Sequence, residues 1–171
     1  MNVPRLLPCC LAACLAACGC GTDYAWRSSV PQEMRTVSVP TFRNESNLQE
    51  AGAVATRQVL REFQREGTFA VLGSDDAAIQ IQGTVNSADG GVGVFDRRSG
   101  LRLSGCEIVV EATVSVVDKR RGKVLVDNRG YRATATFAAS DDITTAQRGA
   151  VGRAMEDLAR QIVDDVLSLK F

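Results

Sequence analysis

The stretch "CEIVVEATVSVVDKRRGKVLVDNRGYRATATF", residues 106–137, carries the strongest structural signal in the chain. Its first half alternates apolar and polar residues, which is the pattern of a strand with one buried face. The residues of the apolar phase are Ile108, Val110, Ala112, Val114 and Val116. Lys119-Arg120-Arg121-Gly122 then reads as a hairpin turn, and the alternation returns from Val124 to Phe137. The phase shifts near Asn128-Arg129-Gly130, which predicts a bulge in a long antiparallel hairpin.

Two amphipathic helices are predicted to cover the apolar face of this hairpin. The first begins at an Asn47 N-cap, with Glu50 three residues on, and stops at Gly67. Its apolar face consists of Leu48, Ala51, Ala55, Val59, Leu60 and Phe63. The second runs from Ile143 to Leu169, with Ser140, Asp141 or Asp142 as its cap. Its apolar stripe consists of Val151, Ala154, Leu158, Ile162, Val166 and Leu169.

Shorter apolar runs predict the remaining strands. Residues 35–39 alternate until Pro40, which cannot donate to a sheet ladder and so ends the strand. Another strand contains Ile79, Ile81 and Val85, and the glycine-rich residues 88–93 after it read as a loop.

These elements predict a single α+β domain over residues 32–171. We expect a two-layer sandwich, with a mostly antiparallel sheet of about four strands and both amphipathic helices packed on one face. The other face of the long strand is mixed and is free to meet a partner. Its residues are Val109, Glu111, Thr113, Ser115 and Val117.

The N-terminus has the organisation of a lipoprotein signal. A short basic start and an apolar run precede small residues, and the run is too short to span a bilayer. Leu-Ala-Ala-Cys occurs twice, ending at Cys14 and at Cys18, and resembles the lipobox of bacterial lipoproteins. Cleavage before Cys18 gives a signal peptide over residues 1–17 and a lipid-anchored tether over residues 18–31, whereas cleavage before Cys14 would leave a cramped apolar region.

The expected modification of Cys18 is a covalent diacylglycerol together with an N-acyl chain, because stable anchoring takes more than one acyl chain. Gly19, and not an aspartate, follows Cys18, which resembles the outer-membrane address of Gram-negative lipoproteins. We therefore expect the domain on the periplasmic face of the outer membrane.

Composition argues against an enzyme. The chain has no histidine, which removes histidine acid/base catalysis, histidine-activated nucleophiles and the commonest metal ligand. With Cys18 acylated, only Cys20 and Cys106 remain as thiols, which makes a zinc site improbable without histidine. Either the two pair, or Cys106 is a small apolar residue in a strand and Cys20 is a spare thiol. The pairs Asp75-Asp76, Asp141-Asp142 and Asp164-Asp165 fit turns, caps or a solvated helix face better than a catalytic dyad. No catalytic residue, metal ligand or further cofactor is predicted, and the net charge of zero gives no sign of nucleic-acid binding.

Several segments, in one order, resemble the LptE family of lipopolysaccharide-assembly lipoproteins. "RTVSVPTFRNES" supplies Val39, Pro40, Phe42 and Asn44 of a Val-Pro-x-Phe-x-Asn pattern. "LREFQREGTFAVL", "AAIQIQGTV", "GKVLVDNRGYRATATF" and "LARQIVDDVL" follow, so that the resemblance covers nearly the whole chain behind the lipobox.

The resemblance implies a non-enzymatic protein that plugs or supports the LptD β-barrel and assists lipopolysaccharide transport at the outer membrane. The rival role is a periplasmic adaptor lipoprotein that activates a peptidoglycan synthase or scaffolds a secretion channel. Clustered cations at a rigid tip suit phosphate groups, so Lys119, Arg120 and Arg121, with Arg97 and Arg98, are the candidate lipopolysaccharide contacts. The alternative for these cations is a solvated turn that blunts a sheet edge.

Overall fold

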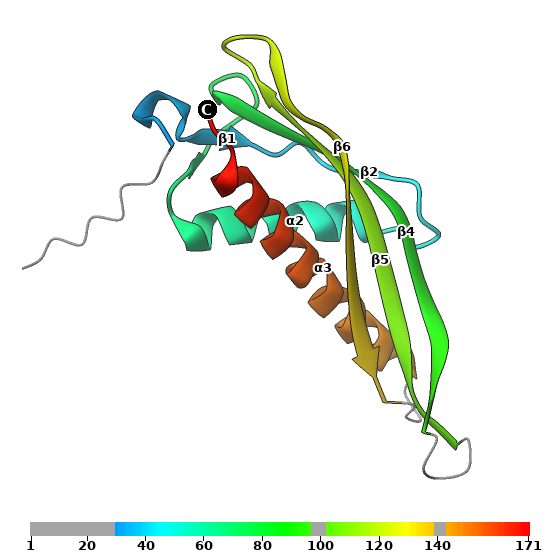
Figure 1. Ribbon diagram of the computed structural model, residues 1–171. Coiled ribbons are helices and arrows are strands. Elements are labelled where there is room, and N and C mark those ends of the chain that lie inside the picture. The colour runs from blue at the N-terminus through cyan, green and yellow to red at the C-terminus, as the bar shows by residue number, and fades with distance from the viewer. Residues whose placement is uncertain (1–29, 97–101, 139–142) are drawn as a thin grey trace, which may run out of the picture.

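The computed structural model describes residues 30–96, 102–138 and 143–171 (Figure 1). Cys14, Cys18 and Cys20, the arginines Arg97 and Arg98, and the predicted cap at residues 140–142 lie outside this part. After a 3₁₀ turn, η1 (Gln32–Met34), the chain forms one mixed sheet and two helices on a single face of it. The predicted α+β architecture is therefore confirmed.

The sheet has six strands, in the order β3-β1-β4-β5-β6, with β2 paired to β4. The long strands β4 (Ile79–Asp96), β5 (Arg102–Asp118) and β6 (Lys123–Phe137) are antiparallel, as expected. The short strands are β1 (Thr36–Ser38), β2 (Arg43–Asn44) and β3 (Ala70–Val71). Strand β1 pairs in parallel with β3 and β4, and β2 pairs in parallel with β4. The sequence did not predict these parallel pairs. The parallel pairing of β1 with β3 follows from the helix between them, because a crossover helix returns the chain in the same direction.

The glycine-rich residues 88–93 are not the predicted loop: they lie within β4 and stay paired with β5. The pairing register shifts between Val85 and Ser87 and again between Gly90 and Val92, so each shift adds one residue on β4. The buried phase accordingly changes from Val85 to Ala88. Glycine and small residues at this point bend the strand rather than end it.

The helices α2 (Ala51–Glu66) and α3 (Ile143–Ser168) cross each other beneath the sheet, and α3 follows β5 and β6 (Figure 1). They bury Phe63, Leu158 and Ile162 completely, as predicted. The prediction that Leu60 joins this face is wrong, since Leu60 is only half-buried. Leu60 follows the buried Val59 by one residue, and one residue is a rotation of about 100° around a helix.

The bulge predicted near Asn128 is confirmed. Asn128 has a positive φ of 44°, and the β5–β6 register shifts between Val114 and Val116 and once more before Val117. The Oγ of Ser115 accepts a hydrogen bond from the Asn128 backbone N–H at 3.0 Å, which holds the irregular point against β5.

The predicted Asn47 cap of α2 is wrong, because the helix starts at Ala51 without a side-chain cap. Asn44 organises the approach to the helix instead: its Nδ2 donates to the carbonyl of Leu48 at 2.8 Å, and its Oδ1 accepts from the Ser46 Oγ at 2.7 Å. The predicted stop at Gly67 is confirmed, with φ at 81°. Within the described residues, neither helix has the length and apolarity needed to cross a membrane.

Candidate functional site

The turn between β5 and β6, residues 118–123, is the strongest candidate site and is called the basic turn below. Asp118 begins it and is fully buried, while Arg120 and Arg121 are exposed. The Oδ1 of Asp118 accepts the backbone N–H of Arg120 at 2.9 Å and that of Arg121 at 3.1 Å. Gly122 closes the turn with φ at 61°, a conformation that glycine adopts readily. The turn is therefore fixed by its own first side chain.

The basic turn is also braced by a neighbouring segment. The Nζ of Lys119 donates a hydrogen bond to the carbonyl of Ser74, and its backbone N–H donates to the carbonyl of Ala78 at 2.9 Å. Val124, an exposed apolar side chain, follows the turn directly on β6. The three cations predicted as a group are brought together at one rigid, exposed tip.

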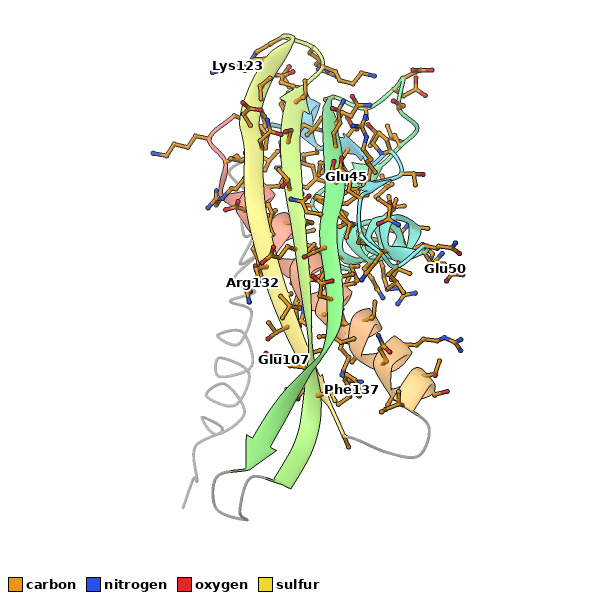
Figure 2. The ribbon with its side chains drawn as sticks, turned by 90° about the vertical axis from the view of Figure 1, so that its right-hand side faces the viewer. Glu45, Glu50, Glu107, Lys123, Arg132 and Phe137 are labelled. Carbon is orange, nitrogen blue, oxygen red and sulfur yellow. The ribbon has the colours of Figure 1, made fainter. Side chains whose placement is uncertain are left out.

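The described residues that flank the other predicted cations lie far from this tip. Arg97 and Arg98 are outside the described residues, but Asp96 and Arg102, which flank them, pair at the start of β5. The basic turn follows the end of β5, 17 residues later. At about 3.3 Å per residue, the two ends of β5 are about 55 Å apart. Figure 2 shows the extended course of β6, which pairs with β5, from Lys123 at the turn to Phe137.

The sheet face opposite the helices is polar and hollowed. A depression of about 800 Å³ lies over β2, β4 and β5, with Asn128 of β6 at its side. Its lining is mainly of uncharged hydrogen-bonding residues, among them Gln80, Gln82, Thr84, Asn86, Thr113, Ser115 and Asn128. Asn86 Nδ2 donates to Thr113 Oγ1 at 2.8 Å. Beyond the depression, Arg132 and Glu111 form an ion pair at 3.2 Å.

A half-buried carboxylate of α3 ties the helix to β6. The Oδ2 of Asp165 accepts the Tyr131 hydroxyl at 2.5 Å and lies 2.7 Å from Nη1 of Arg129. Burial, and then the Asp165 carboxylate, raise the pKa of the Tyr131 hydroxyl far above its usual value, and Arg129 opposes this shift. The expectation that Asp164 and Asp165 both face solvent holds only for Asp164. Asp165 is structural.

Other candidate chemistry is sparse in the part of the chain that the structure describes. There, no cluster of three or more histidine, cysteine, aspartate or glutamate residues is placed to hold a metal ion. Cys106 is a free thiol buried in β5, which fits the view of it as a small apolar strand residue. Asp75 and Asp76 lie exposed in a turn, as expected.

Sequence reasoning missed the role of Asp118, the residue directly before the predicted hairpin turn. A signal was present, because aspartate at the first position of a turn accepts backbone N–H groups two and three residues on. Its complete burial had no such signal, since Asp118 pairs with Ile79, a residue far away in the sequence.

Known structures share this fold. A lipoprotein from Caulobacter crescentus is 17% identical, with a TM-score of 0.51 over 75% of this chain and 89% of that chain. The PelC dodecamer from Paraburkholderia phytofirmans is 17% identical, with a TM-score of 0.51 over 78% and 89%. A minor lipoprotein from Acinetobacter baumannii is 12% identical, with a TM-score of 0.53 over 79% and 94%. At these identities the likeness shows the fold alone.

No curated protein sequence matches the chain. The sequence model of the LptE family, described as lipopolysaccharide-assembly, matches residues 34–166, from η1 into the last turns of α3. This match confirms the resemblance to the LptE family. The chain belongs to the LptE family of lipopolysaccharide-assembly lipoproteins, which is non-catalytic.

Proposed function

We propose that this protein is an outer-membrane lipoprotein, anchored through Cys18 on the periplasmic face, that plugs or supports an LptD-like β-barrel and assists lipopolysaccharide transport. Family membership supplies the general role in lipopolysaccharide assembly. The observation that carries the barrel contact is the polar sheet face, which the two helices leave uncovered.

The chemistry of that face suits the inside of a large barrel. Interiors of large membrane barrels are polar, so a docking domain needs hydrogen-bonding groups rather than an apolar patch. The face offers amides and hydroxyls, and its charges are of opposite sign: Arg43 with Glu45, and Arg132 with Glu111. The domain is elongated, since β5 alone is about 55 Å long, and only a large barrel can receive a domain of this size.

The basic turn supports a contact with lipopolysaccharide phosphates. Arg120 and Arg121 are exposed at a braced tip, where their guanidinium groups can form charge-assisted, bidentate hydrogen bonds with phosphate. Arg97 and Arg98 remain a second candidate group. The flanking residues of the two groups lie at opposite ends of β5, so the two groups of cations would contact different phosphates, or lipopolysaccharide at different points of its transport route.

Site-specific photo-crosslinking tests the barrel contact. A crosslinking amino acid at Ser115, in the polar depression, should capture a large β-barrel protein from intact envelopes. The matched control is the same amino acid at Glu156, which is exposed on α3 on the helix side. Equal yields from both positions, or adducts only with an inner-membrane enzyme, would contradict the proposed docking face.

A charge-matched pair of triple variants tests the phosphate contact. Replacing Lys119, Arg120 and Arg121 by Gln should weaken binding to phosphorylated lipid A about tenfold, at about 0.5 kcal/mol per exposed contact. The fold should be unchanged, because exposed turn charges add little to stability. The control replaces Arg57, Arg61 and Arg65, which are exposed on α2, and removes the same charge elsewhere. Equal binding by the wild type and the turn variant would exclude the turn as a phosphate contact.

The second candidate is the adaptor role, in a secretion channel or beside a peptidoglycan synthase. One comparison favours keeping it: the PelC structure that shares this fold is a dodecamer. Mass measurement of the detergent-solubilised protein distinguishes the two. A ring oligomer would favour the channel scaffold, whereas a one-to-one complex with a barrel would favour the LptE-type role.

A further inference from the structure

The buried carboxylate under the basic turn has an unusual environment. Asp118 is 0% exposed, yet it begins a turn whose other side chains lie in solvent. A buried carboxylate is expected to have its oxygens hydrogen-bonded, because burial without partners is costly. Asp118 meets this expectation with only one of its two oxygens.

The two oxygens have different surroundings. Oδ1 accepts two backbone N–H groups and so determines the shape of the turn. Oδ2 is buried and has no hydrogen-bond partner among the described residues. The nearest cation is Arg121, whose Nε lies 3.9 Å from Oδ2. At that distance the ion pair is electrostatic and lacks a hydrogen bond.

This arrangement makes the two arginines of the turn unequal. The Arg121 side chain is 63% exposed and faces the Asp118 charge from the solvent side. The Arg120 side chain makes no ion pair within the described residues, although its backbone N–H is bound to the same carboxylate. A phosphate that approaches the turn therefore meets the full positive charge of Arg120, whereas the positive charge of Arg121 is partly neutralised by Asp118.

We infer that Asp118 is a positioning residue of the phosphate contact, which fixes the turn through Oδ1 and competes with a bound phosphate for Arg121 through Oδ2. This inference rests on the proposed lipopolysaccharide contact. A phosphate oxygen can approach the guanidinium at hydrogen-bond distance, which the buried Oδ2 does not, so binding draws Arg121 away from Asp118. The carboxylate thus limits affinity, which suits a surface that must release the glycolipid.

The replacement Asp118→Asn separates the two roles. The amide keeps a carbonyl oxygen that can accept the two backbone N–H groups, and it removes the negative charge that faces Arg121. Binding to phosphorylated lipid A should tighten about two- to fivefold, the range expected for an exposed ion pair. The gain should require Arg121: it should vanish in an Arg121→Gln background and persist in the matched Arg120→Gln background.

The experiment measures binding of the full-length protein in detergent to three kinds of micelle, at low and moderate salt. The micelles carry bisphosphorylated lipid A, dephosphorylated lipid A or phosphatidylglycerol. The gain should appear with phosphorylated lipid A and be absent without phosphate. An equal gain with phosphatidylglycerol would still support competition for Arg121 and would assign the contact to any lipid phosphate. In the native Asp118 background, Arg120→Gln should weaken binding and lower its salt dependence more than Arg121→Gln.

The outcomes separate this inference from the proposed function. If Arg120→Gln weakens binding but Asp118→Asn leaves it unchanged, the carboxylate does not compete and the inference is overturned while the phosphate contact stands. If neither arginine variant weakens binding, both the inference about Asp118 and the proposed phosphate contact are refuted. If Asp118→Asn does not fold, the two arginine variants still test the inference. A larger loss of binding in Arg120→Gln than in Arg121→Gln would support it, and equal losses would overturn it.

Discussion

We expect position 83 to accept only glycine, because the aromatic ring of Phe42 occupies the space that a side chain would need. Gly83 lies on the inner face of β4, and a Cβ built there would lie 2.2–2.5 Å from three carbons of that ring. Ordinary carbon contacts are about 3.5–4.0 Å, so the ring would have to move by about 1 Å or more. We therefore expect Gly83→Ala to destabilise the protein.

The ring has no room to retreat. Phe42 is 3% exposed, and its backbone N–H is held by the Oγ1 of Thr56 at 2.9 Å. Behind it, Gly52 lets α2 approach so closely that a Cβ there would lie 2.4 Å from the Phe42 carbonyl oxygen. Forced overpacking of this kind costs about 1–3 kcal/mol. Phe42→Ala alone should cost about 3–5 kcal/mol through the cavity that it leaves.

The double variant gives the decisive value. Without the ring, the methyl group added by Gly83→Ala would occupy free space, so the double variant should be about as stable as Phe42→Ala alone, with a coupling of about 1–3 kcal/mol. Urea unfolding followed by circular dichroism measures all four species. Gly130→Ala is the matched control: it is also a strand glycine, has no atom within 4 Å of the added Cβ, and should change stability by less than about 0.5 kcal/mol. If Gly83→Ala costs the same with and without Phe42, the ring contact is not the reason for glycine.

Three further outcomes are expected. Phe63→Ala should lower the free energy of unfolding by about 3–5 kcal/mol, whereas Leu60→Ala, outside the core, should cost well under half of that in the same urea titration. Because the pKa of Tyr131 is raised in the folded state, its contribution to stability is complete below the ordinary tyrosine pKa of about 10 and declines at higher pH. Tyr131→Phe should therefore flatten the loss of stability between neutral pH and about pH 11, and an unchanged slope would exclude Tyr131 as its source. Cys18→Ser should abolish palmitate labelling and leave an uncleaved precursor, and labelling that instead disappears in Cys14→Ser would move the cleavage site.

The sequence predicts the parts of this fold that depend on local periodicity. The hairpin of β5 and β6, its bulge and the buried stripe of α3 follow from alternation and helical spacing within single segments. Local patterns could not predict the pairing between strands that lie far apart in the sequence. The strands β2 and β3 have two residues each and carry no periodic signal, and they exist because β4 and β1 offer open edges. The glycine-rich part of β4 departs from the predicted loop for the same reason, since its pairing with β5 outweighs its low strand propensity.

The candidate site shows the same division. The exposed cations of the basic turn could be predicted, because the hairpin turn between two alternating runs is local information. The difference in ion pairing between Arg120 and Arg121 could not be predicted, because it depends on a buried Asp118, whose strand partner, Ile79, lies far earlier in the chain. Likewise, the Arg129–Asp165–Tyr131 contact joins β6 to α3 across a long separation in sequence.

Two residues that carry the resemblance to the family, Phe42 and Asn44, are engaged in contacts within the chain. Phe42 fills the space above Gly83, and Asn44 fixes the chain that leads into α2. Neither side chain is available to a partner, since Phe42 is buried and both polar side-chain atoms of Asn44 have bonds within the chain. Phe42 and Asn44 of the Val-Pro-x-Phe-x-Asn pattern therefore serve packing and local structure. Pro40 of the same pattern borders the polar depression, so the proposed contacts remain the polar sheet face and the basic turn rather than Phe42 or Asn44.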